Sequence, residues 1–426
     1  MKLNVLVLGS GGREHALCDK ISRSPRLEKF FCAPGSSAIS RLARCVHFDI
    51  LNPATVLEFA VKNKINLVVV GPEVPLAAGV SDALGKRKIA CFGPTRRAAR
   101  LESSKAFAKE FMKKYEIPTA HFRAFQSFSS VSRYLSQITE RPLVVKASGL
   151  AGGKGVFVCE NKRAALLAAK KLMEERIFKD AGDKVVIEEC LTGPELSVMG
   201  LTDGRSFVLL PLSRDHKRLK DRDLGPNTGG MGAFAPVSVS TKIKEEIEKI
   251  FKKTLTGIRR EKMNYRGLLY CGLMLTEDGP KVLEFNCRFG DPETQAVLPL
   301  MDSDLLPFLW ATSQKKLKGL KLKVRKKTSV CVNLVSEGYP EKIKIGRRIS
   351  GLEKKHEGAQ IFHCGTVLEN GEWKSAGGRV LSVVGVGSNL KDARQKAYGG
   401  ADAILFQGRA FRRDIAKERI FRQKLK

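Results

Sequence analysis

The sequence predicts a multidomain protein of mixed class, with an α/β part followed by α+β parts. The chain has 426 residues, which is too long for one hydrophobic core and suggests about three domains at roughly 150 residues each. Its N-terminal part alternates apolar strands with helices, the order expected of a doubly wound parallel sheet. The middle mixes strands with long Gly-rich loops, as in α+β lobes, and the C-terminal part predicts a mixed α+β cap.

Composition excludes several classes of protein. With 43% hydrophobic residues, we expect no long disordered regions, and no apolar run approaches the roughly 18–20 residues of a membrane span. Met1-Lys2-Leu3 leads directly into a strand, so we expect no secretory signal. The ten cysteines are scattered without a C-x-x-C pair, which predicts reduced thiols in the cytoplasm rather than a disulfide or zinc framework.

The chain carries a formal net charge of +32, which attracts anionic partners. Much of the excess lies in residues 214–222, 315–327 and 412–426. A nucleic-acid-binding protein would interleave aromatic side chains with these basic residues, and residues 315–327 contain none. A general Lys/Arg bias is the alternative explanation. We therefore expect small-molecule partners, no membrane, no nucleic acid, and a monomer.

The chain opens with an apolar strand at residues 3–8 and a Gly-rich turn that starts a helix. Backbone amides at Gly9, Gly11 and Gly12 could approach an anion at the helix N-terminus. Glu14 stands where a dinucleotide fingerprint needs its third Gly, which argues against an NAD-dependent oxidoreductase. Tight packing is the alternative explanation for these glycines.

Strand–helix units continue the doubly wound pattern. The expected strands are residues 30–33, 46–49, 67–70 and 90–92, and the expected helices are residues 54–63 and 76–86. Ligands bind at the carboxyl ends of strands in such sheets, where Gly71-Pro-Glu73 lies. Glu73 could hold ribose hydroxyls, or it could be only a neighbour of a helix N-cap.

Two lysines and a Gly-rich loop follow. Ser103 to Tyr115 predicts a capped helix, and Lys105 in its first turn opposes the helix dipole, which favours a ligand role over stability. A strand at residues 142–146 ends in Lys146 and precedes a loop that contains Gly152, Gly153, Lys154 and Gly155. Gly155 rules out a Walker A motif. Between two strands, the loop could instead fold over phosphates as a lid, with Lys146 and Lys154 offsetting their charge.

The next segment contains strands at residues 185–191, 196–200 and 207–212. A polar, Gly-rich stretch at 213–232 is too long for a plain connection, which is itself a hint of function. Among its polar side chains, we rank Lys217 as an electrostatic group above His216 as a general base. Backbone amides of residues 227–232 could bind a phosphate group.

The most informative stretch reads Glu-Phe-Asn-Cys-Arg-Phe-Gly-Asp-Pro-Glu at residues 284–293. Residues 282–286 predict a strand that pairs with residues 268–275. Because side chains alternate in a strand, Leu283 and Phe285 should enter the core, and Glu284 and Asn286 should share the other face roughly 6.6 Å apart. Such oxygens suit Mg²⁺, which usually takes one or two protein ligands plus phosphates and water. Arg288 follows, and its planar guanidinium could bind an anion through two N–H groups.

The remaining segments are less specific. Helices are expected at residues 242–258 and 304–312, and residues 315–327 predict a solvated domain boundary. Short strands at 329–335, 359–364, 365–368 and 378–387 and a helix at 390–404 predict the C-terminal cap.

Residues 282–295 resemble the signature of the phosphoribosylamine–glycine ligases (glycinamide ribonucleotide synthetases), which are ATP-grasp enzymes of purine synthesis. Gly-Pro-Glu-Val-Pro-Leu at 71–76, the loop at 147–156 and short motifs near Gly338, Phe362 and Arg412 are also similar to this family. Departures are visible, since Gly152 stands where many relatives have Ala, and Glu341 and Ala416 stand where relatives usually have Gly.

The resemblance implies an ADP-forming ligase that couples glycine to 5-phosphoribosylamine through a glycyl phosphate, with ATP and Mg²⁺ or Mn²⁺ as cofactors. Another ATP-grasp carboxylate–amine ligase is the alternative. The implied nucleotide-binding residues are Lys105, Lys146, Gly152, Gly153, Lys154, Gly155, Glu188, Glu189, Leu191 and Glu195. The substrate-binding residues are Gly9, Gly11, Gly12, Glu73, Asn227, Thr228, Gly229, Gly230, Arg288 and Asp291. The catalytic residues are Lys217, Asp215, Arg288 and Asp291, and the metal ligands are Glu284 and Asn286.

The resemblance also implies a division of the chain. Residues 1–102 would form the doubly wound domain, and residues 103–120 a helix that links it to the ATP-grasp core. Two α+β lobes would form that core, a small lid lobe at 121–191 and a large lobe with the metal site at 192–325. Residues 326–426 would form the cap.

Overall fold

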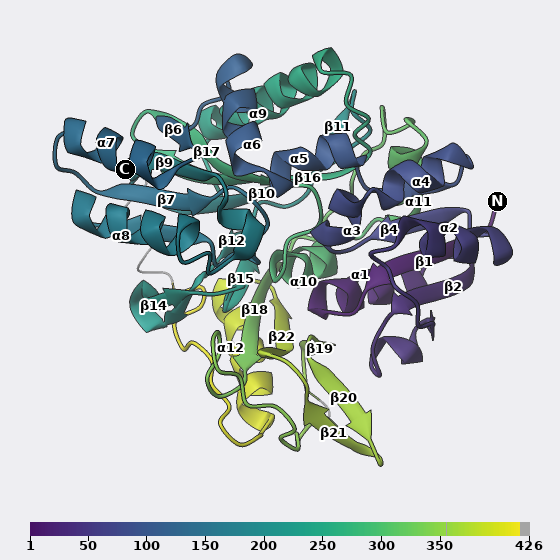
Figure 1. Ribbon diagram of the computed structural model, residues 1–426. Helices are drawn as coiled ribbons and strands as arrows, with labels where there is room; N and C mark the ends of the chain where they lie inside the picture. Colours follow the sequence, from purple (N-terminus) through teal and green to yellow (C-terminus); the bar gives the residue numbers. More distant parts are fainter. Residues whose placement is uncertain (355, 418–426) are drawn as a thin grey trace.

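The computed structural model describes residues 1–354 and 356–417, and Figure 1 shows how its sheets are arranged. The N-terminal part is a five-stranded parallel sheet in the order β3-β2-β1-β4-β5, as the sequence predicts for a doubly wound fold. Its strands are β1 (Leu3–Gly9), β2 (Leu27–Pro34), β3 (Arg44–Cys45), β4 (Leu67–Val70) and β5 (Ala90–Phe92). Its helices are α1 (Gly12–Ser22), α2 (Pro53–Lys62), α3 (Glu73–Ala78), α4 (Val80–Lys86) and α5 (Arg96–Ser103).

Two predictions for this part are wrong. Residues 46–49 do not form a strand, since β3 ends at Cys45; the amide of Val46 still donates to the carbonyl of Cys32, and the ring of Phe48 packs on that of Phe59 with centroids 5.0 Å apart. The predicted helix at residues 76–86 is two helices, because Gly79 has a φ of +97°, a left-handed conformation that ends α3 and starts α4.

A small antiparallel sheet in the order β6-β9-β7-β8 forms the second part. Helix α6 (Lys105–Lys114) leads into it, and α7 (Phe128–Gln137) and α8 (Lys162–Met173) pack together on it. The strands are β6 (Phe122–Phe125), β7 (Leu143–Ala147), β8 (Val156–Cys159) and β9 (Val185–Glu189). This lobe has a hydrophobic core of its own, formed by residues between 125 and 187, so it can move as a unit.

The third part is an antiparallel sheet in the order β11-β10-β16-β17. Helix α9 (Thr241–Arg260) packs against it and begins at Ser240, whose side chain accepts a hydrogen bond from the amide of Ile243. The strands are β10 (Glu195–Thr202), β11 (Phe207–Leu209), β16 (Gly267–Thr276) and β17 (Gly279–Asn286), and α10 (Glu293–Val297) and α11 (Leu305–Ser313) follow. The predicted pairing of residues 268–275 with the strand of Glu284 is confirmed.

The last sheet, in the order β12-β15-β18-β22-β19, joins two distant segments of the chain. Strands β12 (Arg214–Asp215) and β15 (Gly232–Ala235) pair with each other, and β15 pairs with β18 (Thr328–Val335). The other strands are β22 (Arg379–Gly387) and β19 (Ala359–His363), with α12 (Leu390–Ala403) packed on β22. The segment that carries Asp215 and Lys217 is therefore anchored to C-terminal strands.

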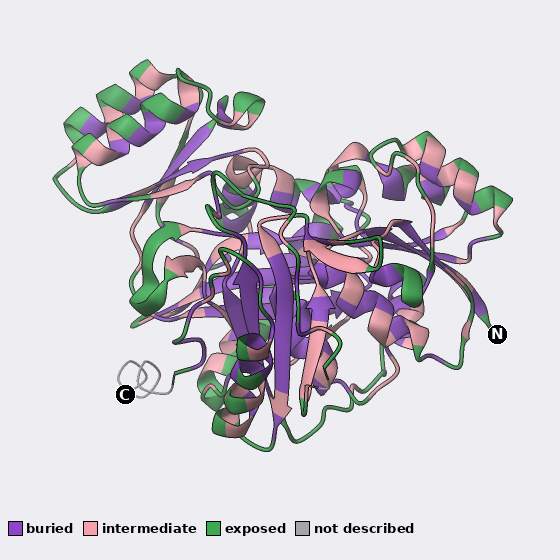
Figure 2. Cartoon of the chain, turned by 90° about the horizontal axis from the view of Figure 1, so that it is seen from below, coloured by how far each residue is buried: buried purple, intermediate pink, exposed green. Residues whose placement is uncertain are grey.

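Two hairpins project from this framework, β13 (Arg218–Lys220) with β14 (Leu224–Asn227) and β20 (Thr366–Glu369) with β21 (Glu372–Ser375). Short 3-10 helices cover Ile39–Arg41, Lys179–Gly182, Asp221–Asp223 and Leu298–Leu300. Figure 2 shows buried strands through the middle of the molecule and exposed faces on the outer helices. None of the described helices combines the length and the hydropathy needed to cross a membrane. Part of the basic segment 412–426 lies outside the described residues.

Candidate active site

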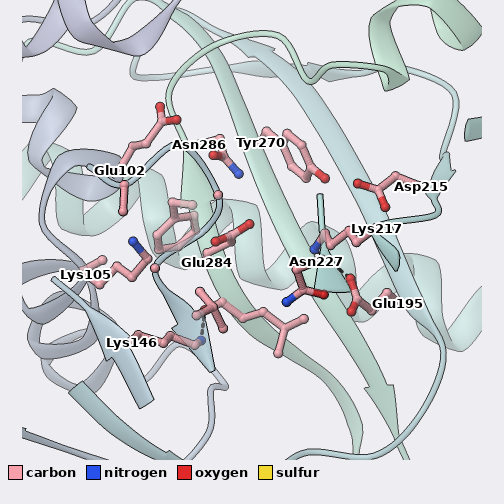
Figure 3. A pocket seen from close by; sticks show the side chains of 18 of the residues that line it. Glu102, Lys105, Lys146, Glu195, Asp215, Lys217, Asn227, Tyr270, Glu284 and Asn286 are labelled. Carbon is pink, nitrogen blue, oxygen red and sulfur yellow. Dashed lines mark hydrogen bonds and ion pairs between the residues drawn. The ribbon is translucent and has the colours of Figure 1, made fainter. Parts of the chain in front are cut away.

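A cavity of about 460 Å³ is lined by strands of the three antiparallel sheets and by helices of the N-terminal part. Most predicted site residues line this cavity, but those of the first Gly-rich turn do not. Figure 3 shows the carboxylates and lysines at the centre of the cavity. The predicted residues that line it are Glu73, Lys105, Lys146, Gly152, Gly153, Gly155, Glu188, Glu189, Leu191, Glu195, Asp215, Lys217, Asn227, Thr228, Gly229, Glu284, Asn286, Arg288 and Asp291. The predicted residues that do not line it are Gly9, Gly11, Gly12, Lys154 and Gly230.

Strand β17 presents Glu284 and Asn286 to this cavity, as predicted. The prediction that Leu283 enters the core is wrong. The strand register shifts between Val282 and Glu284, so Leu283 is half-buried and lines the cavity, while Val282 and Phe285 are buried. A bulge of this kind re-aims side chains next to a site.

The donor set fits a divalent cation. Burial raises the pKa of Glu284, but the positive charges of Lys217, Lys105 and Lys146 outweigh it and hold that pKa below its usual value, so the carboxylate is charged. The described residues contain no group of three or more His, Cys, Asp or Glu side chains that could hold a metal ion. An ion at Glu284 and Asn286 would therefore take its other ligands from phosphates and water, as Mg²⁺ usually does.

Lys105 and Lys146 stand on one side of Glu284 (Figure 3). The ammonium of Lys105, in the first turn of α6, donates to the carbonyl of Gly149 at 3.4 Å, and burial lowers its pKa. The ammonium of Lys146 donates to Oε2 of Glu188 at 2.9 Å and to the carbonyl of Leu283 at 3.3 Å. Two ammonium groups next to one carboxylate form a cationic end suited to phosphate groups.

The Gly-rich loop between β7 and β8 borders the same end of the cavity. Gly152 and Gly153 have φ values of +57° and +76°, and no atom lies within 4 Å of the position of a Cβ on either. Both therefore meet a backbone requirement, not a packing one. Lys154 does not line the cavity in this structure, because its ammonium donates to the carbonyl of Pro340 at 2.9 Å.

Asp215, His216 and Lys217 alternate between two faces. Asp215 and Lys217 line the cavity (Figure 3), and Lys217 pairs with Glu195 at 2.7 Å. Burial raises the pKa of Asp215, whereas the pKa of Lys217 lies above its usual value because Glu195 and Asp215 outweigh the effect of burial. His216 faces away, accepts the amide of Ala416 at Nε2, and has its pKa lowered to about 3 by burial. The ranking of Lys217 above His216 agrees with this geometry.

The loop after β14 does not offer free amides. The amide of Thr228 donates to the carbonyl of Lys217 at 2.8 Å, that of Gly229 to the hydroxyl of Tyr339 at 2.9 Å, and that of Gly230 to the hydroxyl of Thr228 at 3.0 Å. That these amides serve a phosphate therefore stays a prediction, and it would require them to leave these protein acceptors. Asn227 lines the cavity with its side chain instead.

The first Gly-rich turn is likewise occupied by the protein itself. The amide of Gly11 donates to Oε2 of Glu14 at 2.8 Å, and Arg13 pairs with Glu14 at 2.6 Å. A Cβ on Gly12 would lie 2.5 Å from Sγ of Cys364. The alternative of tight packing therefore explains Gly12, and Arg13 is the residue of this turn that lines the cavity.

Guanidinium groups and carboxylates form two sets of ion pairs at the end of the cavity that Glu73 lines, together called the closed network here because both guanidiniums have carboxylate partners. Arg288 pairs with Glu102 at 3.0 Å and with Glu73 at 3.3 Å. Asp291 pairs with Arg379 at 2.8 Å. Burial raises the pKa of Asp291, but Arg379, Arg13, Gln295 and Arg288 together lower it more, so the carboxylate is charged.

Profiles of one known protein family match most of the chain. Family profiles described as phosphoribosylglycinamide synthetase N domain, ATP-grasp (A) domain and C domain match residues 3–102, 103–294 and 329–418. The chain belongs to the phosphoribosylglycinamide synthetase family. Its central part is therefore an ATP-grasp domain, as the sequence predicts.

Similar proteins support this assignment along the full length. The chain is 45% identical to a phosphoribosylamine–glycine ligase of Caldanaerobacter subterraneus, with 97% of this chain and 99% of that one covered. It is 46% identical to the trifunctional purine biosynthetic protein adenosine-3 of Gallus gallus over 96% of this chain but only 42% of that larger protein.

A crystal structure of a phosphoribosylamine–glycine ligase from Thermotoga maritima has a TM-score of 0.86 at 36% identity, covering 97% of this chain and 100% of that one. A biotin carboxylase from Campylobacter jejuni, at 15% identity and a TM-score of 0.75, covers 96% of this chain and 93% of that one, and shares the fold.

Sequence reasoning missed several side chains that line the cavity of this family member. They are Arg13, Glu102, Lys109, Tyr270 and Arg379. Lys109 could have been found, because it follows Lys105 by four residues and so shares its helix face. No local signal marks Glu102 or Arg379, because their partners Arg288 and Asp291 are far away in the chain.

Proposed function

We propose that this protein is an ADP-forming ligase that couples glycine to 5-phosphoribosylamine and yields glycinamide ribonucleotide. The observation that supports this best is the cavity itself. The ionised carboxylate of Glu284 lies in it, with Lys105 and Lys146 on one side and Lys217, Asp215 and Glu195 on the other (Figure 3). The relatives that bear the name phosphoribosylamine–glycine ligase extend over the same full length.

The proposed reaction has two steps. The carboxylate of glycine attacks the γ-phosphorus of ATP, the bond to the bridging oxygen breaks, and ADP leaves. The amine of phosphoribosylamine then attacks the carbonyl of glycyl phosphate, an amide bond forms, and inorganic phosphate leaves with the proton lost by the amine. Lys105 and Lys146 would offset the negative charge of the triphosphate, and Lys217 the charge that develops at the reacting groups.

Glu284 and Asn286 would hold a divalent ion, Mg²⁺ or Mn²⁺, whose charge offsets that of the phosphates. The lid loop with Gly152, Gly153 and Gly155 would exclude water from the glycyl phosphate, with Lys154 able to approach when the loop closes. The adenosine part would lie against Glu188, which contacts Lys146, and against Glu189, Leu191 and Glu195, which also line the cavity.

Arg288 and Asp291 would position the carboxylate and the amine of glycine. Each already has a partner, Glu73 and Glu102 for Arg288 and Arg379 for Asp291, so glycine would share these groups. Glu73 would also accept a ribose hydroxyl of phosphoribosylamine. For the turn with Gly9, Gly11 and Gly12 we keep the proposed phosphate contact, next to the guanidinium of Arg13, which lines the cavity.

We further propose that the protein works as a monomer in the cytoplasm. All ten cysteines are free thiols in the described structure, and seven of them are buried, which suits a reducing compartment.

The test is ADP release in the presence of ATP, a divalent metal, glycine and freshly prepared phosphoribosylamine. The proposal predicts release that requires both glycine and the amine. A screen of other small amino acids and amines tests the alternative. Release that depends on another acceptor, or no release with any, would reject the assignment.

A further inference from the structure

Glu188 on β9 has two carboxylate oxygens in different situations. The residue is 2% exposed and lines the cavity. Its Oε2 accepts hydrogen bonds from both Lys109 and Lys146, each at 2.9 Å. Its Oε1 is buried and has no hydrogen-bond partner among the described residues. A buried acceptor without a donor is costly, so this oxygen points to a ligand group that donates a hydrogen bond.

Lys109 is held in place from two sides. It is 2% exposed, and its ammonium donates to Oγ1 of Thr119 at 2.7 Å in addition to pairing with Glu188. Oγ1 of Thr119 in turn donates to the carbonyl of Val282 at 2.5 Å. This chain ties α6 to β17 and to β9. Lys109 is therefore an anchored donor, unlike Lys105 one turn before it, whose ammonium contacts only a carbonyl in the described structure.

The walls around Glu188 suit a flat aromatic base. Apolar side chains line the cavity from four strands, namely Val144, Val158, Met274 and Leu283, and Leu191 lines it just after β9. A carboxylate oxygen accepts hydrogen bonds and cannot donate them when ionised. The 6-amino group of adenine would satisfy Oε1, whereas the 6-oxo group of hypoxanthine or guanine would place acceptor against acceptor. A site built around one polar contact rejects ligands that lack it strongly.

We propose that Lys109 is a specificity-determining positioning residue, which holds Oε2 of Glu188 so that the buried Oε1 selects a 6-aminopurine nucleotide over a 6-oxopurine one. This inference rests on the proposed function, because it assumes that the cavity binds ATP. Lys146 alone cannot fix the carboxylate in this way, since its ammonium also donates to the carbonyl of Leu283 at 3.3 Å. Lys109 acts through Glu188 and need not touch the nucleotide.

The experiment compares dissociation constants of ATP and inosine triphosphate, measured by calorimetry without glycine or amine. These two nucleotides have the same sugar and phosphates and differ at the 6-position of the base. For the unaltered protein we expect ATP to bind at least about 100-fold more tightly. For Lys109→Met, we expect the ratio to fall by about tenfold or more, mainly through weaker ATP binding.

Two further variants keep the test decisive. Lys113→Met removes an exposed lysine of the same helix and should leave the ratio unchanged. Thr119→Val removes the hydroxyl that anchors Lys109 but keeps both charges, and should lower the ratio by about threefold. Thr119→Val decides the matter if Lys109→Met fails to fold.

The outcomes separate this inference from the proposed function. If ATP binds and is preferred but the ratio is the same in Lys109→Met and in Thr119→Val, Lys109 has only a structural role and the inference is overturned. If the unaltered protein binds ATP and inosine triphosphate equally, the inference is also overturned while the ligase proposal stands. If neither nucleotide binds, the proposed function fails first.

Discussion

The two ends of the cavity arrange their positive charges differently. Near the lid lobe, the ammonium of Lys105 contacts a backbone carbonyl and no carboxylate within the described structure. Near the N-terminal sheet, the guanidinium of Arg288 pairs with Glu73 and Glu102, and that of Arg379 pairs with Asp291. At the first end Lys109 and Lys146 share one carboxylate, Glu188, and Lys105 forms no ion pair in the described structure, so positive charge is in excess. At the second end both guanidiniums have carboxylate partners, which makes it a closed network.

This difference suggests a division of labour. Cationic charge without a carboxylate partner is available to a highly charged ligand, and a triphosphate is such a ligand. A guanidinium that is already hydrogen-bonded to carboxylates holds those carboxylates in fixed positions. Fixed carboxylates can orient small substrates that carry little charge. We therefore assign the lid-lobe end to the nucleotide and the other end to glycine and the amine, with Glu284 between them.

Removing the charge between the two ends should have the largest effect. Glu284→Gln keeps the size of the side chain but loses the carboxylate that neighbouring lysines keep ionised. We expect turnover to fall by about 10³-fold, because a charged ligand of the proposed metal and its balance against the lysines are lost. Steady-state ADP release measures this. Glu277→Gln, on the exposed turn before the same strand, is the control. Retained turnover would show that the metal assignment is wrong.

Opening the closed network should affect one end only. Arg379→Met removes the hydrogen bonds to Oδ2 and to the carbonyl of Asp291 and the contact with the carbonyl of Gly229. We expect kcat/KM for the amine to fall by about 10²-fold, since a misplaced Asp291 no longer orients the substrates. Arg379→Lys should recover only part of the loss, because an ammonium lacks the planar fork. Lys391→Met, on an exposed part of α12, should change nothing.

His216 lies between Asp215 and Lys217 in the chain and faces away from the cavity that these two residues line. Burial lowers the pKa of His216 to about 3, below the usual 6.5. Below pH 6.5 His216 binds a proton in the unfolded chain but stays neutral in the native state. The free energy of unfolding is therefore highest above pH 6.5 with respect to this residue, and it decreases as the pH falls towards 3. His216→Gln should therefore take up about one proton fewer on unfolding near pH 5. Denaturant unfolding from pH 7 to 4 measures this, and an unchanged slope would contradict it.

We expect the smallest effect from a change at Ala416, which contacts His216. Ala416 has a φ of +59° and donates its amide to His216. An Ala in the left-handed region is strained, so Ala416→Gly should raise the free energy of unfolding by about 0.5–1 kcal/mol. The same change at Ala401, inside α12, should lower stability by about as much or more. A loss of stability in Ala416→Gly would show that the strain is relieved elsewhere.

Local signals predicted much of the fold and of the nucleotide end. Strands β4 and β5 have the bounds that the apolar runs indicated, and the alternation in a strand brought Glu284 and Asn286 to one face. Lys105 and Lys146 were found because a first-turn lysine and a strand-end lysine are unusual places for a cation. These features depend on neighbours within a few residues.

The closed network could not be predicted, because its partners are far apart in the chain. Asp291 and Arg379 are separated by 88 residues, and the strand that carries Asp215 joins a sheet made mostly of C-terminal strands. The misplaced Leu283 and the occupied amides of residues 228–230 have the same origin. A bulge and a loop conformation depend on cross-strand partners that no local pattern reveals.

One measurement tests the division of labour most directly. Calorimetry gives the ATP dissociation constant, and steady-state kinetics give KM for phosphoribosylamine, in Lys105→Met and in Arg379→Met. The account predicts opposite effects. Lys105→Met should weaken ATP binding by about tenfold and leave KM for the amine near its original value, and Arg379→Met should raise KM and leave ATP binding within about twofold. Equal weakening of ATP binding in both variants would contradict the account.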